Sequence, residues 1–177
     1  TAKGAVLRDE NDREYIDFFA GAGTLNYGHN NPILKERVLE YIREDGILHG
    51  LDMATEAKRG LLEAFDQNIR WARKYKYKLQ FPGPTGTNAV EAALKLARKV
   101  TGRSGIISFT NGFHGVSLGS LAVTANQHFR EGAGVDLPDS SFMPYDGYLG
   151  QDVDTVDYLR RFIEDKSSGI DLPAAVI

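Results

Sequence analysis

Alternating strand and helix patterns in the second half of the sequence constrain the fold more than any other feature. Tyr77, Leu79 and Phe81 alternate with polar residues, as in a strand with one wetter face. A helical pattern over residues 88–100 and an apolar run at 105–109 follow. Strand, crossover helix and strand at this spacing predict two parallel strands with a right-handed connection. The sequence therefore predicts an α/β fold with a mainly parallel sheet.

Residues outside this unit predict further elements. Residues 5–18 read as a hairpin, and Asn31-Pro32 predicts the start of a helix, with Asn31 as N-cap and Pro32 at the first helical position. We also expect a helix from near Thr55, a helix over about 116–123, a loop-rich region at 124–150, a helix over 152–165 and a strand at 173–177. The buried side of the helix over 152–165 is predicted to comprise Val153, Val156, Leu159, Phe162 and Ile163.

The apolar residues 173–177 begin a strand at the end of the sequence. Strands of open parallel sheets are buried on both faces. A sheet that stops at the first residues of such a strand is unfinished, so we expect the sequence to be a piece of a longer protein.

Composition narrows the class of protein. The formal net charge of -3, without a strongly basic segment, gives no reason to expect nucleic acid as a partner. The absence of cysteine excludes disulfides and Cys-ligated metal sites within this chain. No apolar run is long enough to span a membrane, and no signal-peptide pattern is present. These features favour a cytoplasmic protein without a membrane partner.

The turn Thr85-Gly86-Thr87 is the first candidate site. It separates the strand at 77–81 from the helix over 88–100, so its backbone N–H groups and hydroxyls meet the positive end of a helix dipole. Such an arrangement binds phosphate. The alternative is a well-capped helix after a tight turn, in which Asn88 and Glu91 form a capping box. The lysine of a P-loop is absent after Gly86.

The pair Phe113-His114 is the second candidate. It lies between two glycines after the strand at 105–109, and ligands bind at the carboxyl ends of adjacent parallel strands. The pair could therefore stack on a flat ring. The alternative is that Phe113 fills the core and His114 is a loop histidine with satisfied hydrogen bonds.

The other histidines and the serines do not form a catalytic pattern. His29 lies in a glycine-rich turn, where hydrogen bonds to the backbone are expected. His49 and His128 have no partner at metal-ligand spacing, and no serine lies in a nucleophile elbow. The sequence thus favours neither a metal site nor a hydrolase.

Taken together, the segments resemble the class III pyridoxal-phosphate aminotransferases. The matching stretches occur in the order of the family: Asp12-Arg13-Glu14-Tyr15-Ile16-Asp17-Phe18, Asn26-Tyr27-Gly28-His29-Asn30-Asn31-Pro32, Thr85-Gly86-Thr87-Asn88 with the helix after it, and Phe113-His114-Gly115. The resemblance covers essentially the whole chain. It implies a fold-type-I transferase, with residues 1–46 from the small domain and 47–177 from the first half of the large, cofactor-binding domain.

The resemblance also implies roles for particular residues. Gly86 and Thr87 would hold the phosphate of pyridoxal 5'-phosphate, with Thr85 shaping the turn. Phe113 would lie on one face of the cofactor ring, with His114 beside it. Bordering the substrate channel would be Ala22 and Gly23.

The activity implied is transfer of an amino group between amino-acid and oxo-acid or aldehyde substrates, by a homodimer. Several stretches are most similar to members that use glutamate and aspartate semialdehyde. Ornithine or 4-aminobutyrate specificity, or a non-catalytic fragment, are the alternatives. No catalytic residue is assigned within the chain, because the family's Schiff-base lysine is expected beyond Ile177.

Overall fold

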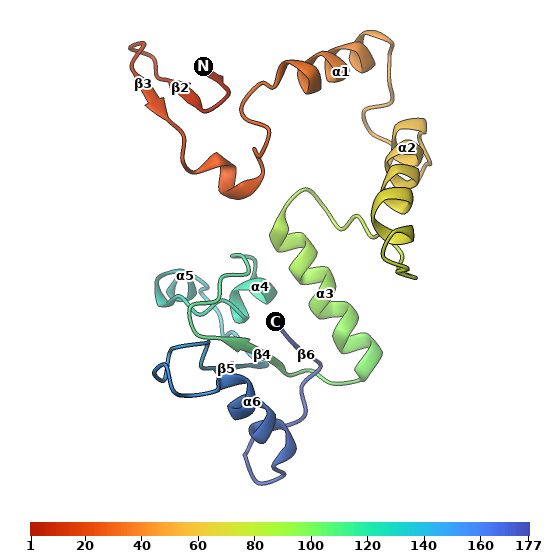
Figure 1. The fold of residues 1–177 in the computed structure, drawn as a ribbon. Coiled ribbons are helices and arrows are strands. Elements are labelled where there is room, and N and C mark those ends of the chain that lie inside the picture. Colours follow the sequence, from red (N-terminus) through yellow and green to blue (C-terminus); the bar gives the residue numbers. More distant parts are fainter. The chain divides into compact units, whose positions relative to one another are not determined.

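The computed structural model describes all residues from Thr1 to Ile177. Two compact units, Thr1–Tyr77 and Lys78–Ile177, divide the chain. Each unit contains one three-stranded sheet, and Figure 1 labels the helices and strands. The expected boundary between residues 46 and 47 concerns the domains of the complete protein and stays a prediction.

The first unit begins with an antiparallel sheet of strands β1 (Ala2–Lys3), β2 (Val6–Arg8) and β3 (Glu14–Ile16). β2 and β3 confirm the predicted hairpin, whereas β1 has no signal in the sequence. The Asp9 carboxylate holds the turn, because it accepts hydrogen bonds from the backbone N–H groups of Asn11 and Arg13 and from the Tyr15 hydroxyl.

The side chain of His29 forms a hydrogen bond with the carboxylate of Asp17 and not with the backbone. Nε2 of His29 lies 2.7 Å from Oδ2 of Asp17, and the expectation of backbone bonding by this ring is wrong. The backbone of His29 pairs separately with Gly4. These contacts tie the sheet to the start of the following helix.

Helices α1 (Pro32–Arg43) and α2 (Glu56–Phe65) follow, and a π-helical segment, η2 (Asp66–Trp71), continues α2. Asn31 caps α1 as predicted, since its side chain accepts from the N–H groups of Ile33 and Leu34. Thr55 caps α2 in the same way through the N–H of Lys58. Neither helix contains a buried residue.

The sheet of the second unit is parallel, with the order β5-β4-β6. β4 (Ile106–Phe109) is central; β5 (Ser140–Met143) pairs with it from Ile106↔Ser140 to Phe109↔Met143, and β6 (Ala175–Val176) pairs on its other edge. This confirms the parallel sheet and the strands at 105–109 and 173–177. β5 lies in the region expected to be loops, where the sequence pattern did not indicate it.

The predicted strand at 77–81 is wrong, and so is its pairing with residues 105–109. Residues 75–83 belong to no helix or strand. Both edges of β4 are occupied by β5 and β6, so the position expected for the earlier strand is taken. An alternating pattern describes where side chains point, but a strand also needs a neighbour for its hydrogen bonds.

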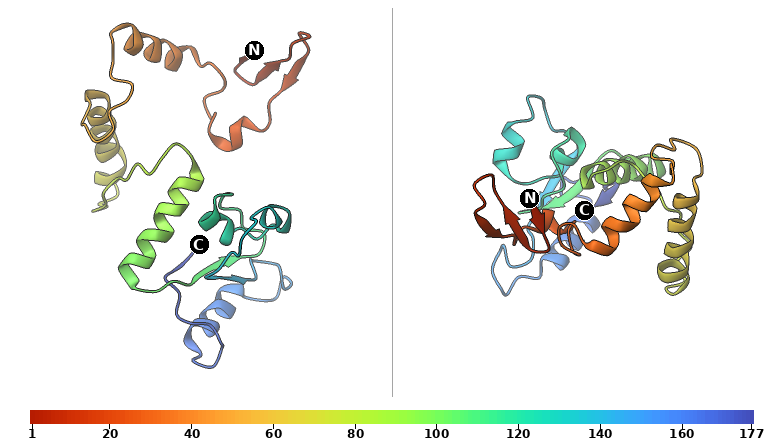
Figure 2. Two further views of the ribbon diagram at one scale, coloured as in Figure 1. Left: turned by 180° about the vertical axis from the view of Figure 1, so that it is seen from behind. Right: turned by 90° about the horizontal axis from the view of Figure 1, so that it is seen from above.

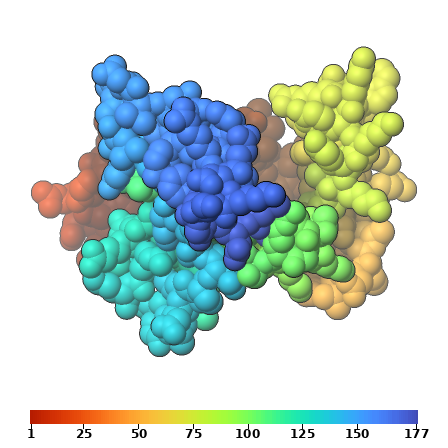
Figure 3. Space-filling view, turned by 90° about the horizontal axis from the view of Figure 1, so that it is seen from below, coloured from red at the N-terminus to blue at the C-terminus, as the bar shows by residue number.

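Helices cover both sides of this sheet: α3 (Gly86–Thr101), α4 (Leu118–Ala122), α5 (Gln127–Glu131) and α6 (Thr155–Glu164). In Figure 1, α3 and α4 lie above the sheet and α6 lies below it, and the view from behind in Figure 2 agrees. Seen from below in Figure 3, the C-terminal residues in blue form the front of this unit. The core between sheet and upper helices contains Leu94, Ile106 and Val123.

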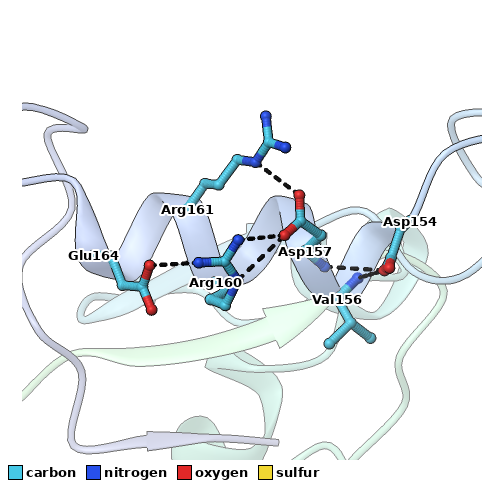
Figure 4. Close-up of polar contacts among 6 residues, drawn as sticks. All are labelled: Asp154, Val156, Asp157, Arg160, Arg161 and Glu164. Carbon is cyan, nitrogen blue, oxygen red and sulfur yellow. Dashed lines mark hydrogen bonds and ion pairs between the residues drawn. The ribbon is translucent and has the colours of Figure 1, made fainter.

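Charged side chains joined by hydrogen bonds and ion pairs run along α6, as Figure 4 shows. Asp154 caps the helix by accepting from the N–H groups of Val156 and Asp157, and Arg160 bonds to both Asp157 and Glu164. Val153 and Val156 are exposed, however, so the predicted buried side is confined to Leu159, Phe162 and Ile163, which are partly buried.

Candidate functional site

Helix α3 begins earlier than its sequence pattern suggests, and Thr85, not Asn88, is its N-cap. The Thr85 hydroxyl accepts from the N–H of Asn88 at 3.3 Å, and Oδ1 of Asn88 accepts from the N–H of Thr85 at 3.3 Å. This reciprocal pair is a capping box. The expected capping box of Asn88 and Glu91 is therefore wrong. The box consists of Thr85 and Asn88, and the helix begins about one turn earlier than predicted.

Two donors remain without an acceptor at this helix start. The N–H groups of Gly86 and Thr87 make no hydrogen bond within the chain. A Cβ placed on Gly86 would have no atom of the chain within 4 Å. The turn thus presents free N–H groups toward open space at the positive end of a 16-residue helix, an arrangement suited to an anion.

The segment after β4 lies directly against this helix start. Oγ1 of Thr87 lies 3.0 Å from Oγ of Ser117, and the Ser120 hydroxyl donates to the carbonyl of Thr87 at 3.2 Å. Gly115 packs so closely that a Cβ on it would overlap the Thr87 side chain, and its φ of +125° also favours glycine. The structure therefore brings together the two candidate segments that the sequence separates.

Phe113 does not fill the core. Its side chain is 58% exposed, and its ring meets Phe129 edge to face, with centroids 5.2 Å apart. This contact braces the ring and leaves much of its surface open. The core-filling alternative for Phe113 is thus wrong, and a face for stacking is available.

His114 is held from its backbone and is neutral near pH 7. Its N–H donates to the Thr124 hydroxyl at 3.0 Å, and burial lowers the pKa of its ring. The residue lines a hollow of about 250 Å³ at the carboxyl end of the sheet, together with Phe109, Tyr145 and Ile177. A larger hollow of about 440 Å³ lies at the opposite, amino end of the strands and includes none of the candidate residues.

Glu91 is a residue whose role the sequence did not reveal beyond helix capping. Its Oε1 accepts from the Ser117 hydroxyl at 2.6 Å and from the N–H of Ser120 at 3.0 Å. Burial raises the pKa of Glu91, but hydrogen bonds from Ser117, Ser120 and Gly119 outweigh it and leave the pKa below its usual value. The carboxylate is therefore ionised near neutral pH.

The two substrate-channel candidates lie in the other unit. Ala22 and Gly23 belong to the short helix η1 (Ala20–Gly23), with φ values of 53° and 90°. A positive φ is unusual for alanine. Their role stays a prediction, separate from the site on α3.

Comparisons with known proteins identify the family. The class III aminotransferase model matches residues 1–177, and the chain belongs to this family. It is 66% identical to a diaminobutyrate–2-oxoglutarate transaminase from Bordetella parapertussis, over 99% of this chain and 40% of that protein. It is 60% identical to a protein of the same name from Wolinella succinogenes, over 99% of this chain and 41% of that one.

Solved structures agree on the fold. An amine transaminase from an uncultivated Pseudomonas species, in its PLP-bound form, superimposes with a TM-score of 0.81 at 23% identity. The match covers 99% of this chain and 42% of that one. The chain thus has the α/β fold of part of a class III transaminase and spans about 40% of the length of the curated relatives. None of its helices is long and apolar enough to cross a membrane.

Proposed function

We propose that this chain forms the phosphate-binding and ring-binding part of a pyridoxal-phosphate-dependent aminotransferase. The observation that carries the proposal is the contact between the two candidate segments. The free N–H groups of Gly86 and Thr87 lie on the helix against which the segment of Phe113 and His114 is packed.

The residues present fit this cofactor. Gly86 and Thr87 would hold its phosphate through their backbone N–H groups, while the capping box of Thr85 and Asn88 keeps these groups aligned. Phe113 would lie on the ring, and neutral His114 would sit beside it. When bound, pyridoxal phosphate supplies an electron sink for cleavage of bonds at the amino-acid α-carbon.

The reaction we propose for the full-length protein is transfer of an amino group from glutamate to L-aspartate 4-semialdehyde. The products are 2-oxoglutarate and L-2,4-diaminobutyrate, which we assign to ectoine biosynthesis. Support comes from the names of relatives that are 60–66% identical to this chain. The Schiff-base lysine is proposed to lie beyond Ile177.

Cofactor binding is tested on the purified full-length protein. We expect a protein-bound visible chromophore, which reduction with borohydride attaches covalently. A protein that carries no chromophore, even after incubation with pyridoxal phosphate, would contradict the proposal.

Specificity is tested by glutamate-dependent formation of 2-oxoglutarate with three aldehydes. Aspartate 4-semialdehyde should give the highest kcat/KM, ahead of glutamate 5-semialdehyde and succinate semialdehyde. A preference for either of the others would indicate an ornithine-type or a 4-aminobutyrate-type enzyme.

We further propose that the complete protein is a cytoplasmic homodimer, with Ala22 and Gly23 bordering the substrate channel. We also propose residues 1–46 as part of its small domain and 47–177 as part of its large domain. Sedimentation of the full-length protein tests the dimer. The alternative, a non-catalytic fragment, predicts no activity with any of the three aldehydes.

A further inference from the structure

Residues 120–124 form a continuous buried run in the second unit, although two of their side chains are polar. Ser120, Leu121, Ala122, Val123 and Thr124 are all buried. Buried polar groups need hydrogen-bond partners, and a short helix cannot supply them for its own ends. Side chains from other elements must therefore bind this segment.

Glu91 supplies that binding at the start of α4. Ser117 occupies the N-cap position, yet its side chain makes no capping bond to the helix. The Ser117 hydroxyl donates to Glu91 instead, and Glu91 also accepts from the N–H of Ser120. Gly119 packs so closely on this carboxylate that a Cβ would overlap it. A carboxylate on α3 thus caps α4.

The same contact reaches the candidate phosphate site. Thr87 and Glu91 are one turn apart on α3, so their side chains lie on the same face. Ser117 contacts both, at 3.0 Å from Oγ1 of Thr87 and 2.6 Å from Oε1 of Glu91. Because a carboxylate only accepts, the Ser117 hydroxyl donates to Glu91 and accepts a hydrogen bond from the Thr87 hydroxyl.

The capping box at the start of α3 does not need Glu91. Thr85 and Asn88 make it between themselves. Thr124 holds His114 and Gly115, and the run from Ser117 to Thr124 is in turn attached to α3, where the bonds of Glu91 to Ser117 and Ser120 are charge-assisted. Loss of Glu91 would thus loosen the attachment of the ring-binding segment to α3, while the capping box at the phosphate-binding half stays intact.

We propose that Glu91 is a positioning residue that holds the ring-binding segment at a fixed place relative to the phosphate-binding N–H groups. This inference rests on the proposed cofactor function. A ligand that spans both halves gains affinity because they are pre-arranged, whereas a ligand that uses the phosphate half alone does not.

The test compares two ligands on the full-length apoenzyme: pyridoxal phosphate, which spans both halves, and inorganic phosphate, which uses one. In Glu91→Ala we expect the Kd of pyridoxal phosphate to rise about tenfold or more, the usual scale for loss of a hydrogen bond to a charged group. The Kd of inorganic phosphate, measured by calorimetry, should stay within about twofold, since it needs only one half.

Two further variants test the same contact if Glu91→Ala does not fold. Glu91→Gln retains an acceptor of the same shape and should recover part of the affinity. Ser117→Ala removes the link to Thr87 without changing charge and should weaken pyridoxal phosphate in the same direction. Glu131→Ala, a change of the same type on an exposed residue of α5, is the matched control and should have no effect.

A double variant separates positioning from independent effects. If Glu91 and Ser117 act through one contact, Glu91→Ala with Ser117→Ala should lose little more affinity than Glu91→Ala alone. Full additivity would overturn the inference. So would an unchanged Kd for pyridoxal phosphate, or an equal loss of inorganic phosphate binding.

Measurements on the wild-type protein distinguish failure of the proposed function from failure of the role of Glu91. Absence of pyridoxal phosphate binding by the wild type would overturn the proposed function and the inference with it. Normal binding by the wild type, with variants that bind equally well, would overturn the inference alone.

Discussion

The backbone N–H of Gly86 is the group proposed to bind the ligand, and the absence of a side chain leaves this N–H accessible. Its N–H is free, and the space that a Cβ would take contains no atom of the chain within 4 Å. A side chain here would therefore obstruct a ligand without disturbing the fold. This separates effects on binding from effects on stability.

Replacement of Gly86 by valine should weaken retention of pyridoxal phosphate about tenfold or more, because the side chain would occupy the approach to the N–H groups. Equilibrium dialysis of the full-length protein measures this. Gly60→Val is the matched control, since Gly60 is also a helical glycine with no atom within 4 Å of its Cβ position. Equal retention by both variants would refute the role of Gly86.

His114 makes stability depend on pH. Burial lowers the pKa of its ring, so the unfolded chain takes up this proton at higher pH than the folded one. The unfolded state thus binds more protons as the pH falls through the ordinary histidine range, and the free energy of unfolding decreases there. His114→Gln should therefore lose less stability between about pH 7.5 and 5.5 than the wild type.

Chemical denaturation of the full-length protein at the two pH values measures this difference. His128→Gln, on an exposed residue of α5, serves as control. A pH dependence in His114→Gln identical to that of the wild type would show that the ring is not protected from protonation.

At the scale of elements, the start of α3 determines much of the second unit. Thr85 begins the helix one turn before the position that the sequence pattern favours, and Asn88 becomes its capping partner. Glu91 is then free to bind Ser117 and Ser120. Because Thr85 and Asn88 cap the helix, the Glu91 carboxylate is available to the neighbouring segment.

Thr85→Val should destabilise the full-length protein by about 1 kcal/mol, the usual cost of losing a helix N-cap. The isosteric side chain preserves volume but cannot accept from the N–H of Asn88. Thr85→Ser, which keeps the hydroxyl, should remain near wild type. Denaturant unfolding gives the comparison, and a stable Thr85→Val would place the cap elsewhere.

The sequence predicts a helix or strand best where residues close together in the sequence determine it. The side chains of Asn31 and Thr55 cap their helices by accepting from backbone N–H groups two or three residues further on, so local residues suffice. The expected strand at 77–81 and the unexpected β5 depend on which segments pair with β4, which is a non-local property. Alternation alone does not encode the partner.

The candidate site shows the same division. The order of motifs indicated Gly86, Thr87, Phe113 and His114 as parts of one site. Glu91 was missed as a contact of the other segment because its partners, Ser117 and Ser120, lie far along the chain and carry no distinctive pattern. The sequence pattern also placed the start of α3 one turn too late, and it therefore assigned Glu91 to the capping box that Thr85 and Asn88 form.

At the scale of the molecule, the first unit has little interior of its own. No residue of α1, α2 or η2 is buried, and the apolar side chains Leu34, Val38 and Ile42 on α1 are 51%, 57% and 48% exposed. Apolar faces of this kind usually pack against other structure. In relatives this chain corresponds to about 40% of the protein.

Residues 1–177 produced alone should therefore bind a hydrophobic dye such as ANS far more strongly, per mole, than the full-length protein. The reason is that burial of these faces would be incomplete. Fluorescence at equal concentrations measures the difference. Leu34→Glu with Val38→Glu should reduce dye binding by the piece, and equal fluorescence of piece and whole would contradict the expectation.

The central position of β4 has a consequence for synthesis on the ribosome. Its two neighbours, β5 and β6, both come later in the chain, and β6 ends at Val176. One side of the most buried strand therefore stays open until almost all of this sequence has been translated, since parallel pairing must wait for distant residues. Slow translation after β4 would lengthen that interval and favour capture of the nascent strand by chaperones or by a neighbouring chain.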